Sequence, residues 1–596
     1  MPAAAHWHKL LSGVPLSSPV PFMMPLSPNT TVAYFSMEIA LDTAIPTYSG
    51  GLGVLAGDTL RSAADLAVPV VGVTLLHRKG YFEQHLDEGG NQTETPSSWS
   101  PEDVLEAVDA RTTVTIEGRT VTIRAWKYPV RGVTGHEVPV YLLDTELPEN
   151  SEFDRTLTDY LYGGDSHYRL LQEVVLGMGG ASLLRALNVR ADIYHLNEGH
   201  SALLTLRLLD WQLDGRKTFE LDETDIEAVR RRCVFTTHTP VPAGHDKFPL
   251  DLVRQVVGDE DVALLEAVQC VEGGTLNLTH LALRLSRFVN GVAMKHREVS
   301  QGMFPNYPID AITNGVHAGT WASPAFQRLF DRRIPEWRTD SLYLRYAVGI
   351  PLGEIRAAHA EAKKAMIAAI SARTGVSLDP KVFTIGFARR ATPYKRADLV
   401  FTDAQRLADI AANVGPLQIV FGGKAHPHDA GGKDLIRRIH QAASALAGQI
   451  TVVYVENYQM AIAGTMIAGV DLWLNNPMKP LEASGTSGMK AALNGVPSLS
   501  VLDGWWIEGH VEGVTGWSIG GLDPEGDQSK DANEIYLKLE RVILPLYYGL
   551  PFAYAEVMRS AIALNGSFFN TQRMVEQYVR NAYFPDGAPV LAEVAD

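Results

Sequence analysis

The segment GFARRATPYKRAD (386–398) places a cationic loop directly after an apolar run. Its charged and aromatic members include Arg389, Arg390, Tyr394 and Lys395. Arginine forks and a lysine ammonium suit phosphate oxygens, although a run of charge can also be a solvated face. Because the cluster is abrupt in a chain of net charge −16 and begins where an expected strand ends, we interpret it as a phosphate-binding site.

A second reactive candidate is Lys490 in EASGTSGMKAALNG (482–495). It follows the small, donor-rich loop GTSG and lies in the apolar helical run MKAAL. A lone lysine of this kind is more often a surface residue whose ammonium reaches water. The flanking residues indicate an interior position instead, and a buried lysine must be neutral, paired or used covalently. Attachment to an aldehyde cofactor would satisfy this requirement.

Clustered glycines in YSGGLGVLAGD (48–58) precede the helical run TLRSAADLA. Backbone N–H groups at such a helix start can approach an anion, which the helix dipole also favours. Gly51, Gly53 and Ala56 match the spacing of a dinucleotide fingerprint, but the next expected strand ends in His-Arg-Lys (77–79) without an acidic residue for a ribose. Anion binding and a tight turn therefore remain the two interpretations.

Metal and thiol chemistry are disfavoured by the spacing of their usual ligands. The histidines of HLNEGH (195–200) are five residues apart rather than four, and HPHD (426–429) has no partner motif. Cys233 and Cys270 cannot form a disulfide framework, and a thiol buried in an expected strand is usually inert. We expect no metal, and a hydroxyl-rich ligand reached by neutral histidines and amides.

The elements that must position these residues are short apolar runs that alternate with helical patterns. They predict an α/β fold with a mostly parallel sheet buried on both faces. Each run ends in polar or Gly-rich residues, and ligands of such sheets bind beyond the carboxyl ends of the strands. The runs are IYHLNEGH (193–200), CVFTTHTP (233–240), FTIGFARR (383–390), LQIVFGGKAHPHD (417–429), ITVVYVENY (450–458) and VDLWLNNP (470–477).

Two segments depart from this alternation of apolar runs and helical patterns. Residues 112–145 alternate β-branched residues around a Glu117-Gly118 turn, which predicts an antiparallel excursion. The stretch 352–373 is Ala-rich and favours a helix before a new strand at 383. We therefore divide the chain into a first domain (1–350), a linker helix (351–374), a second domain (375–550) and C-terminal helices (551–596) that could pack back on the first.

Composition narrows the class of protein. Of 596 residues, 46% are hydrophobic and 20% charged, which excludes a disordered chain, a collagen-like chain and a small disulfide scaffold. The net charge of −16 argues against general nucleic-acid binding. The proline-broken N-terminus predicts no signal peptide, and no apolar run reaches the roughly 18 residues of a membrane span. We expect a cytoplasmic protein with no nucleic-acid or membrane partner.

Taken together, the motifs resemble the α-glucan phosphorylases, the family of glycogen, starch and maltodextrin phosphorylases, in a compact bacterial form. They cover about 440 residues in the family's order. Each piece is weakly specific, whereas the ordered set is highly specific. The motifs are SGGLG (49–53), HLNEGHSA (195–202), THTP (237–240), TNGV (313–316), RRATPYKR (389–396), GGKAHP (422–427), ENY (456–458) and EASGTSGMK (482–490).

The resemblance implies a GT-B architecture, in which two Rossmann-like domains face a central cleft. It implies a glycosyltransferase that carries pyridoxal 5′-phosphate and cleaves terminal α-1,4 bonds of an α-glucan or maltooligosaccharide with inorganic phosphate. The product would be α-D-glucose 1-phosphate, formed with retention, and family members are commonly homodimers. Substrate phosphate would protonate the leaving oxygen and then attack the sugar, so no pair of enzyme carboxylates is required.

The same resemblance assigns roles to matching positions. The phosphate would be held by Gly50, Gly51, Arg390 and Lys395. The cofactor would be held by Lys490, Arg389, Tyr458, Gly485 and Thr486. Sugar contacts would come from Leu52, His238, Asn314, Tyr394, Glu482, Ala483, Ser484 and Gly485. Catalysis would depend on Lys490, Arg390, Lys395 and His238.

Some features depart from the family pattern. The chain is shorter than the muscle, liver or yeast members, so we expect no control by phosphorylation or nucleotide effectors. Gly488 stands where many members carry Asn, which leaves the chain-length preference open. The alternative function is a nucleotide-sugar-dependent GT-B transferase of the glycogen or starch synthase type, and a third is a non-catalytic glucan-binding protein. Lys490 favours the phosphorylase over the synthase, and the intact motifs argue against a decayed site.

Overall fold

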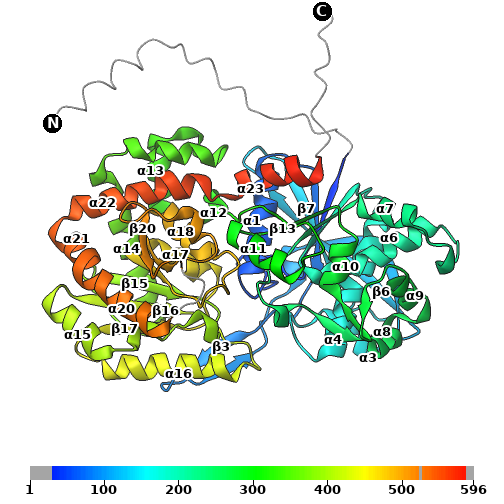
Figure 1. Cartoon of the computed structure of the whole chain (residues 1–596), viewed down its shortest axis with the longest axis horizontal. Helices are drawn as coiled ribbons and strands as arrows, with labels where there is room; N and C mark the ends of the chain where they lie inside the picture. The colour runs from blue at the N-terminus through cyan, green and yellow to red at the C-terminus, as the bar shows by residue number, and fades with distance from the viewer. Residues whose placement is uncertain (1–29, 523–526, 585–596) are drawn as a thin grey trace, which may run out of the picture.

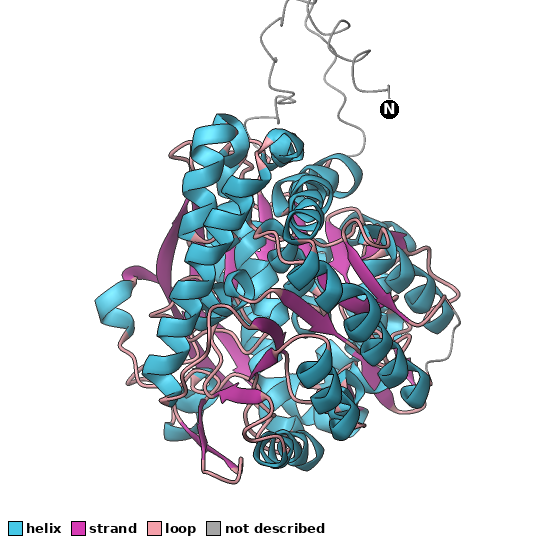
Figure 2. Cartoon of the chain, turned by 90° about the vertical axis from the view of Figure 1, so that its left-hand side faces the viewer, coloured by secondary structure: helices cyan, strands magenta, loops and turns pink. Residues whose placement is uncertain are grey.

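The computed structural model describes residues 30–522 and 527–584, which form two large sheets with helices packed around them (Figures 1 and 2). This confirms the predicted α/β class with parallel sheets. The N-terminal stretch, for which we predicted no signal peptide, and the last part of the expected C-terminal helices lie outside the described residues. Within the described ranges, none of the helices combines the length and hydrophobicity needed to span a bilayer.

The first sheet has nine strands in the order β14-β13-β9-β8-β1-β2-β7-β6-β5. It is parallel from β14 to β7 and antiparallel from β7 to β5. The strands are β1 (Val32–Phe35), β2 (Val70–Leu75), β5 (Glu106–Ile116), β6 (Arg119–Arg131), β7 (Glu137–Asp144), β8 (Ile193–Asn197), β9 (Cys233–Thr236), β13 (Phe288–Gly291) and β14 (Asp310–Ala311).

The antiparallel part of this sheet confirms the predicted excursion. Strands β5 and β6 are joined by Glu117 and Gly118, whose φ angles are 52° and 72°. Two consecutive left-handed residues are what a two-residue hairpin turn needs to match the twist of its strands, and glycine adopts that conformation without strain.

The second sheet has six parallel strands in the order β17-β16-β15-β18-β19-β20. Every residue of β15 and β16 is buried, as expected for a parallel sheet covered on both faces. In Figure 1 this sheet lies to the left of the first. Its strands are β15 (Phe383–Ala388), β16 (Leu417–Gly422), β17 (Thr451–Val455), β18 (Leu472–Asn475), β19 (Ser498–Val501) and β20 (Gly516–Ile519).

The Ala-rich stretch forms the long helix α14 (Leu352–Thr374), as predicted. It ends at Gly375, which adopts the left-handed conformation (φ 70°) that often terminates helices. Its buried face joins the core of the second sheet, where it packs against α17 (Met460–Gly469) and α22 (Pro551–Ser560). The domain boundary at this helix remains a prediction.

The end of the chain returns to the first sheet. Helix α23 (Thr571–Tyr578) packs against α1 (Gly51–Asp65), and the two helices lie next to each other in Figure 1. The hydroxyls of Ser62 and Thr571 are 2.6 Å apart and buried. The apolar face of α23 therefore completes the hydrophobic core on this side of the first sheet.

Candidate functional site

A cavity of about 940 Å³ is lined by loops that follow strands of both sheets. Every residue to which the resemblance assigned a role lines it, although those residues are spread over most of the sequence. Their individual roles remain predictions. They are Gly50, Gly51, Leu52, His238, Asn314, Arg389, Arg390, Tyr394, Lys395, Tyr458, Glu482, Ala483, Ser484, Gly485, Thr486 and Lys490.

One wall of the cavity is the N-terminus of α1. In the part of the chain that the structure describes, the N–H groups of Gly51 and Leu52 have no hydrogen-bond partner. A Cβ added at Gly50 or Gly51 would meet no atom within 4 Å, whereas one at Gly53 would lie 2.7 Å from Glu38 Oε2. Gly53 is thus required by packing, while Gly50 and Gly51 leave open space in front of two free donors, as an anion site needs.

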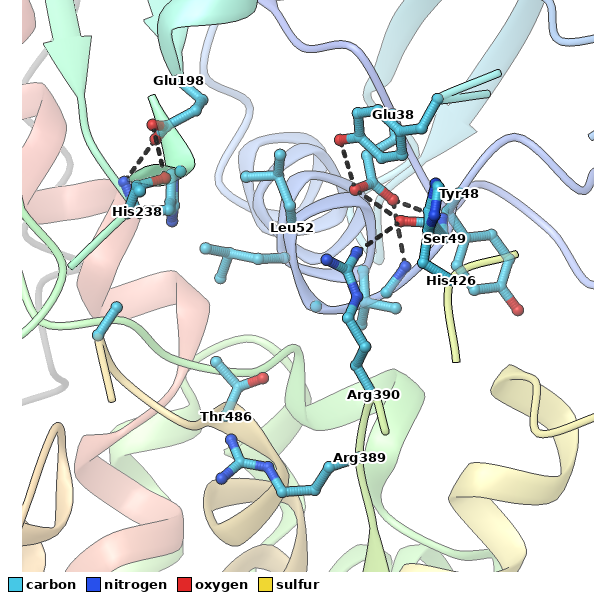
Figure 3. A pocket seen from close by; sticks show the side chains of 18 of the residues that line it. Glu38, Tyr48, Ser49, Leu52, Glu198, His238, Arg389, Arg390, His426 and Thr486 are labelled. Atoms are coloured by element: carbon cyan, nitrogen blue, oxygen red, sulfur yellow. Dashed lines mark hydrogen bonds between the residues drawn. The ribbon is translucent and has the colours of Figure 1, made fainter. Parts of the chain in front are cut away.

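A buried carboxylate fixes the loop before α1. Glu38 accepts hydrogen bonds from the N–H groups of Ser49 (2.5 Å) and Gly50 (3.2 Å) and from the Tyr162 hydroxyl (2.9 Å), as Figure 3 shows in part. We did not select Glu38 or Tyr162 from the sequence. The available signal for Glu38 was a single acidic residue inside the apolar run VAYFSMEIAL.

The cationic loop after β15 sends consecutive arginines in different directions (Figure 3). Arg390 points toward α1, with Nη2 3.4 Å from Ser49 Oγ, and no described carboxylate lies within ion-pair distance of it. Arg389 points toward Thr486, and its Nη1 lies 2.5 Å from Glu482 Oε2. The loop therefore supplies one guanidinium to each side of the cavity.

Glu482 links two of the cations. Its Oε2 lies 2.5 Å from Arg389 Nη1 and 2.9 Å from Lys395 Nζ. Burial alone would raise the pKa of Glu482, but the charges of these two cations outweigh burial and lower it to about 2. Lys395 Nζ also lies 4.5 Å from the centre of the Tyr394 ring. The ionised carboxylate holds both cations at the cavity wall.

A second helix N-terminus faces the cavity from the second sheet. Helix α18 (Thr486–Leu493) begins after Gly485, which has a φ of 90°. Among the described residues, the N–H groups of Gly485 and Thr486 have no acceptor. The helix ends before Asn494 and Gly495, as predicted. The cavity thus has two groups of free backbone donors, one at the start of α1 and one at the start of α18.

Lys490 is buried on α18, with 6% of its surface exposed. Burial lowers the pKa of its ammonium to about 8. Across residues 30–522 and 527–584, Nζ makes no hydrogen bond or ion pair, and it lies 3.7 Å from the centre of the Trp321 ring. The Trp321 indole donates to Asp58 Oδ2 (2.7 Å), which fixes the ring. Such an amine is available for covalent use at neutral pH.

His238 follows β9 and is held as a neutral ring. Its Nε2 donates to Asn197 Oδ1 (2.7 Å), and burial lowers the pKa of the imidazole to about 3. Nδ1 is therefore an acceptor. The His238 N–H donates to Glu198 Oε2 (2.5 Å), and Glu198 has a φ of 77°, a strained conformation typical of functional sites.

Three cavity-lining side chains have an atom without a partner in the described part of the chain: His200 Nδ1, Asn314 Oδ1 and Ser484 Oγ. Asn314 Oδ1 and Ser484 Oγ are buried, yet neither makes a hydrogen bond with protein atoms. Buried polar atoms are almost always paired in native proteins, so these two atoms indicate a ligand that carries hydroxyl groups.

Three of the other histidines that we considered occupy distinct places. His200 and His426 line the cavity, whereas His195 does not. The ring of His195 is buried between the hydroxyls of Thr236 (2.8 Å) and Tyr583 (2.7 Å), which makes it part of the protein core. The sequence pattern alone did not separate these cases, because Tyr583 lies 388 residues away along the chain.

The chain is similar to known enzymes over most of its length. The model of the carbohydrate phosphorylase family matches residues 40–151 and 257–516. A maltodextrin phosphorylase of Thermococcus litoralis is 40% identical, over 93% of this chain and 70% of the relative. Glycogen phosphorylases of Mycobacterium tuberculosis and Aquifex aeolicus are each 36% identical over 93% of this chain. The matched region covers 71% of the first relative and 86% of the second. The segment between the two matched regions contains His238.

Proposed function

We propose that this chain, which belongs to the carbohydrate phosphorylase family, is an α-glucan phosphorylase. It cleaves the terminal α-1,4 bond of a glucan or maltodextrin with inorganic phosphate and releases α-D-glucose 1-phosphate with retention. The observation that carries the proposal is the convergence of two helix N-termini, a cationic loop and a buried, unpaired lysine on one cavity.

Two anions fit the cavity side by side. Arg390 and the Gly51 N–H provide a site for substrate phosphate, and Arg389 and the Thr486 N–H provide one for a cofactor phosphate. Two phosphate dianions repel each other strongly in a partly desolvated site. Lys395, which lines the same cavity and contacts the carboxylate of Glu482, adds the third positive charge that this arrangement needs.

Pyridoxal 5′-phosphate fits the second of these positions. Lys490 has the buried amine, without a partner among the described residues, that attachment requires, and Tyr458 also lines the cavity. Gly485 and Thr486 would bind its phosphate through their free N–H groups. When bound, the cofactor supplies a phosphate group that can exchange a proton with substrate phosphate.

The sugar is held by groups that complement hydroxyls. Asn314 Oδ1 and Ser484 Oγ are free to accept hydrogen bonds, and His238 Nδ1 is an unprotonated acceptor. Ala483 and Gly485 also line the cavity. A neutral polar wall of this kind suits an uncharged glucose unit better than a second anion.

Substrate phosphate carries out the reaction in this proposal. Held by Arg390 and Lys395, it gives its proton to the glycosidic oxygen as the bond from that oxygen to the anomeric carbon breaks. It then attacks the anomeric carbon from the same face, which gives retention. Glu482 cannot be the general acid at neutral pH, since its pKa of about 2 keeps it ionised. Exclusion of water by the cavity walls favours phosphorolysis over hydrolysis.

We also propose the GT-B arrangement, with domains that meet near residues 350–375, and a homodimer. Support for the two domains comes from the separate hydrophobic cores of the two sheets. The packing of α14 with the second sheet and of α23 with the first supports a chain that passes between the domains more than once.

The test is an assay of glucose 1-phosphate release along a series of maltooligosaccharides, combined with cofactor mapping. Borohydride reduction followed by peptide mass analysis should mark Lys490. Arg390→Ala should raise the KM for phosphate far more than the KM for glucan, with Arg390→Lys as the variant that keeps the charge. An unmodified Lys490 peptide from active enzyme would refute the cofactor assignment. Consumption of ADP-glucose or UDP-glucose without phosphorolysis would indicate the synthase type instead.

A further inference from the structure

A small hairpin of the first half reaches the second sheet. It consists of β3 (Glu83–Leu86) and β4 (Gln92–Thr95), which pair with each other and with no other strand in the described part of the chain. In Figure 1 the blue hairpin lies beside the yellow helix α16 (Ala430–Ala445). Its contacts across this boundary involve the motif GGKAHP (422–427), to which we had assigned no role.

Two buried glutamines of the hairpin bind the backbone of that motif. Gln84 Nε2 donates to Gly423 O (3.0 Å), and Gln84 Oε1 accepts from Asn457 N–H (2.9 Å). Gln92 binds Ala425 at both backbone groups, because Nε2 donates to its oxygen (2.8 Å) and Oε1 accepts from its N–H (3.0 Å). The two side chains thus pair with the loop as a neighbouring strand would.

The two glutamines also support each other. Gln84 Nε2 donates to Gln92 Oε1 at 2.8 Å, and the two side chains are 1% and 7% exposed. A network of buried amides with all partners in place holds a fixed geometry, and removal of one member leaves the others unsatisfied. The hairpin therefore fixes the loop more rigidly than a surface contact could.

The loop in turn carries the arginines of the cavity. Gly422 O accepts the N–H of Arg389 (3.1 Å), and Lys424 O accepts the N–H of Ala391 (3.0 Å). Gly423 has a φ of 141°, and a Cβ there would lie only 1.9 Å from Arg389 O, so the two loops are in direct backbone contact. Displacement of the loop would therefore displace the arginines.

The hairpin also holds a further cation at the cavity. Lys424 lines the cavity, and its Nζ donates to Phe82 O (2.8 Å) just before β3. Nζ lies 5.1 Å from the centre of the Phe82 ring. No carboxylate of the described residues forms an ion pair with Lys424, so its charge is available to an anion in the cavity.

We propose that the β3–β4 hairpin is a strap that sets phosphate affinity, with Gln84 and Gln92 as positioning residues and Lys424 as a further anion-binding group. This inference rests on the proposed phosphorolysis. The strap acts through the loop at 422–425, which sets the position of Arg389 and Arg390, so it affects phosphate binding and leaves the sugar-binding wall at Asn314 unchanged.

The test compares the variants Gln84→Ala, Gln92→Ala and Lys424→Met with the wild-type holoenzyme. Each should raise the KM for inorganic phosphate at least about tenfold, with the KM for maltooligosaccharide changed less than about twofold. His85→Ala is the matched control, because it removes an exposed contact within the hairpin that involves neither glutamine (His85 Nε2 and Thr95 Oγ1 are 2.9 Å apart), and should leave both constants unchanged.

Equal changes in both KM values, or no change, for the glutamine variants would overturn the strap. An unchanged phosphate KM for Lys424→Met would remove Lys424 from the site. If an alanine variant does not fold, Gln92→Met keeps the length of the side chain and removes both hydrogen bonds to Ala425, and the same split is expected. If the wild type fails to cleave glucan, the proposed function fails, whereas the strap is still tested by the rise in melting temperature on addition of inorganic phosphate. That rise should be smaller in the glutamine variants, and an equal rise would refute the strap separately.

Discussion

Replacement of Lys490 by methionine should stabilise the cofactor-free protein while it abolishes activity. Burial lowers the pKa of Lys490 from 10.5 to about 8. One pKa unit corresponds to about 1.4 kcal/mol, so the charged side chain lowers the free energy of unfolding by about 3 kcal/mol at pH 7. The cation–π contact with the Trp321 ring stabilises the charged side chain by about 1–2 kcal/mol and offsets part of this cost. Methionine packs at this position without a charge, so the free energy of unfolding of the variant should be about 1–2 kcal/mol higher than that of the wild type.

The stability difference between wild type and variant should change with pH in a direction that can be measured. The pKa of Lys490 is lower in the folded than in the unfolded protein, so the unfolded state binds more protons between pH 8 and pH 10.5. Stability of the wild type must rise across that interval relative to the variant. The advantage of methionine is full below pH 8 and disappears above pH 10.5.

The assay is urea unfolding of both cofactor-free proteins at pH 7 and pH 10.5. Lys364→Met, at an exposed position on α14, is the control for the same chemical change and should alter stability little. The reasoning is refuted if Lys490→Met lowers the stability at pH 7, or if the difference between wild type and variant does not shrink at the higher pH.

Four further substitutions test other parts of the structure. Glu482→Gln removes the charge that holds two loop cations, so phosphate should raise the melting temperature of the variant more than that of the wild type; equal rises would contradict competition between carboxylate and anion. Gly51→Ala should raise the KM for phosphate with little change in melting temperature, whereas Gly57→Ala, whose Cβ would lie 2.0 Å from a backbone oxygen, should lower the melting temperature; the reverse pattern would contradict the packing argument. Asp471→Asn removes the counter-charge of Lys363, 2.5 Å away, and should lower the free energy of unfolding by about 3–5 kcal/mol in urea titrations. Burial alone would raise the pKa of Asp471, but Lys363 and its neighbours outweigh burial and lower it, so this stabilisation is present above about pH 4 and is lost in more acidic solution; a stability difference that does not decrease there would contradict it.

The sheets and the gathering of the site could be predicted because both follow from local patterns. An apolar run such as 383–388 is typical of a strand that is buried on both faces of a parallel sheet. Parallel strands end at one edge, so the polar residues that follow them meet there. That rule brings Arg390 and Lys490 into one cavity, and Gly51 reaches it through the helix start that its glycine cluster indicated.

Contacts whose partners lie far away along the chain could not be predicted. Gln84 and Gln92 lie in polar strands, and the backbone groups that they bind are 339 and 333 residues away. Nothing in their own segment indicates a buried partner. Glu38 was missed although two of its donors, Ser49 and Gly50, are only 11 and 12 residues away, because the apolar run around it does not indicate which N–H groups its carboxylate binds. Local periodicity describes a strand or helix, whereas such pairs depend on how distant elements are placed together.

The contact between α1 and α23 has a consequence for how the protein is made. The two hydroxyls that join these helices are separated by 509 residues. At about 5–20 residues per second, a ribosome needs roughly 25–100 s to synthesise the stretch between them. During that time the part of helix α1 that will pack against Thr571–Tyr578 has no cover from its own chain. A nonsense codon shortly before Thr571 would therefore yield a polypeptide that contains every candidate site residue and lacks the last layer over its first sheet.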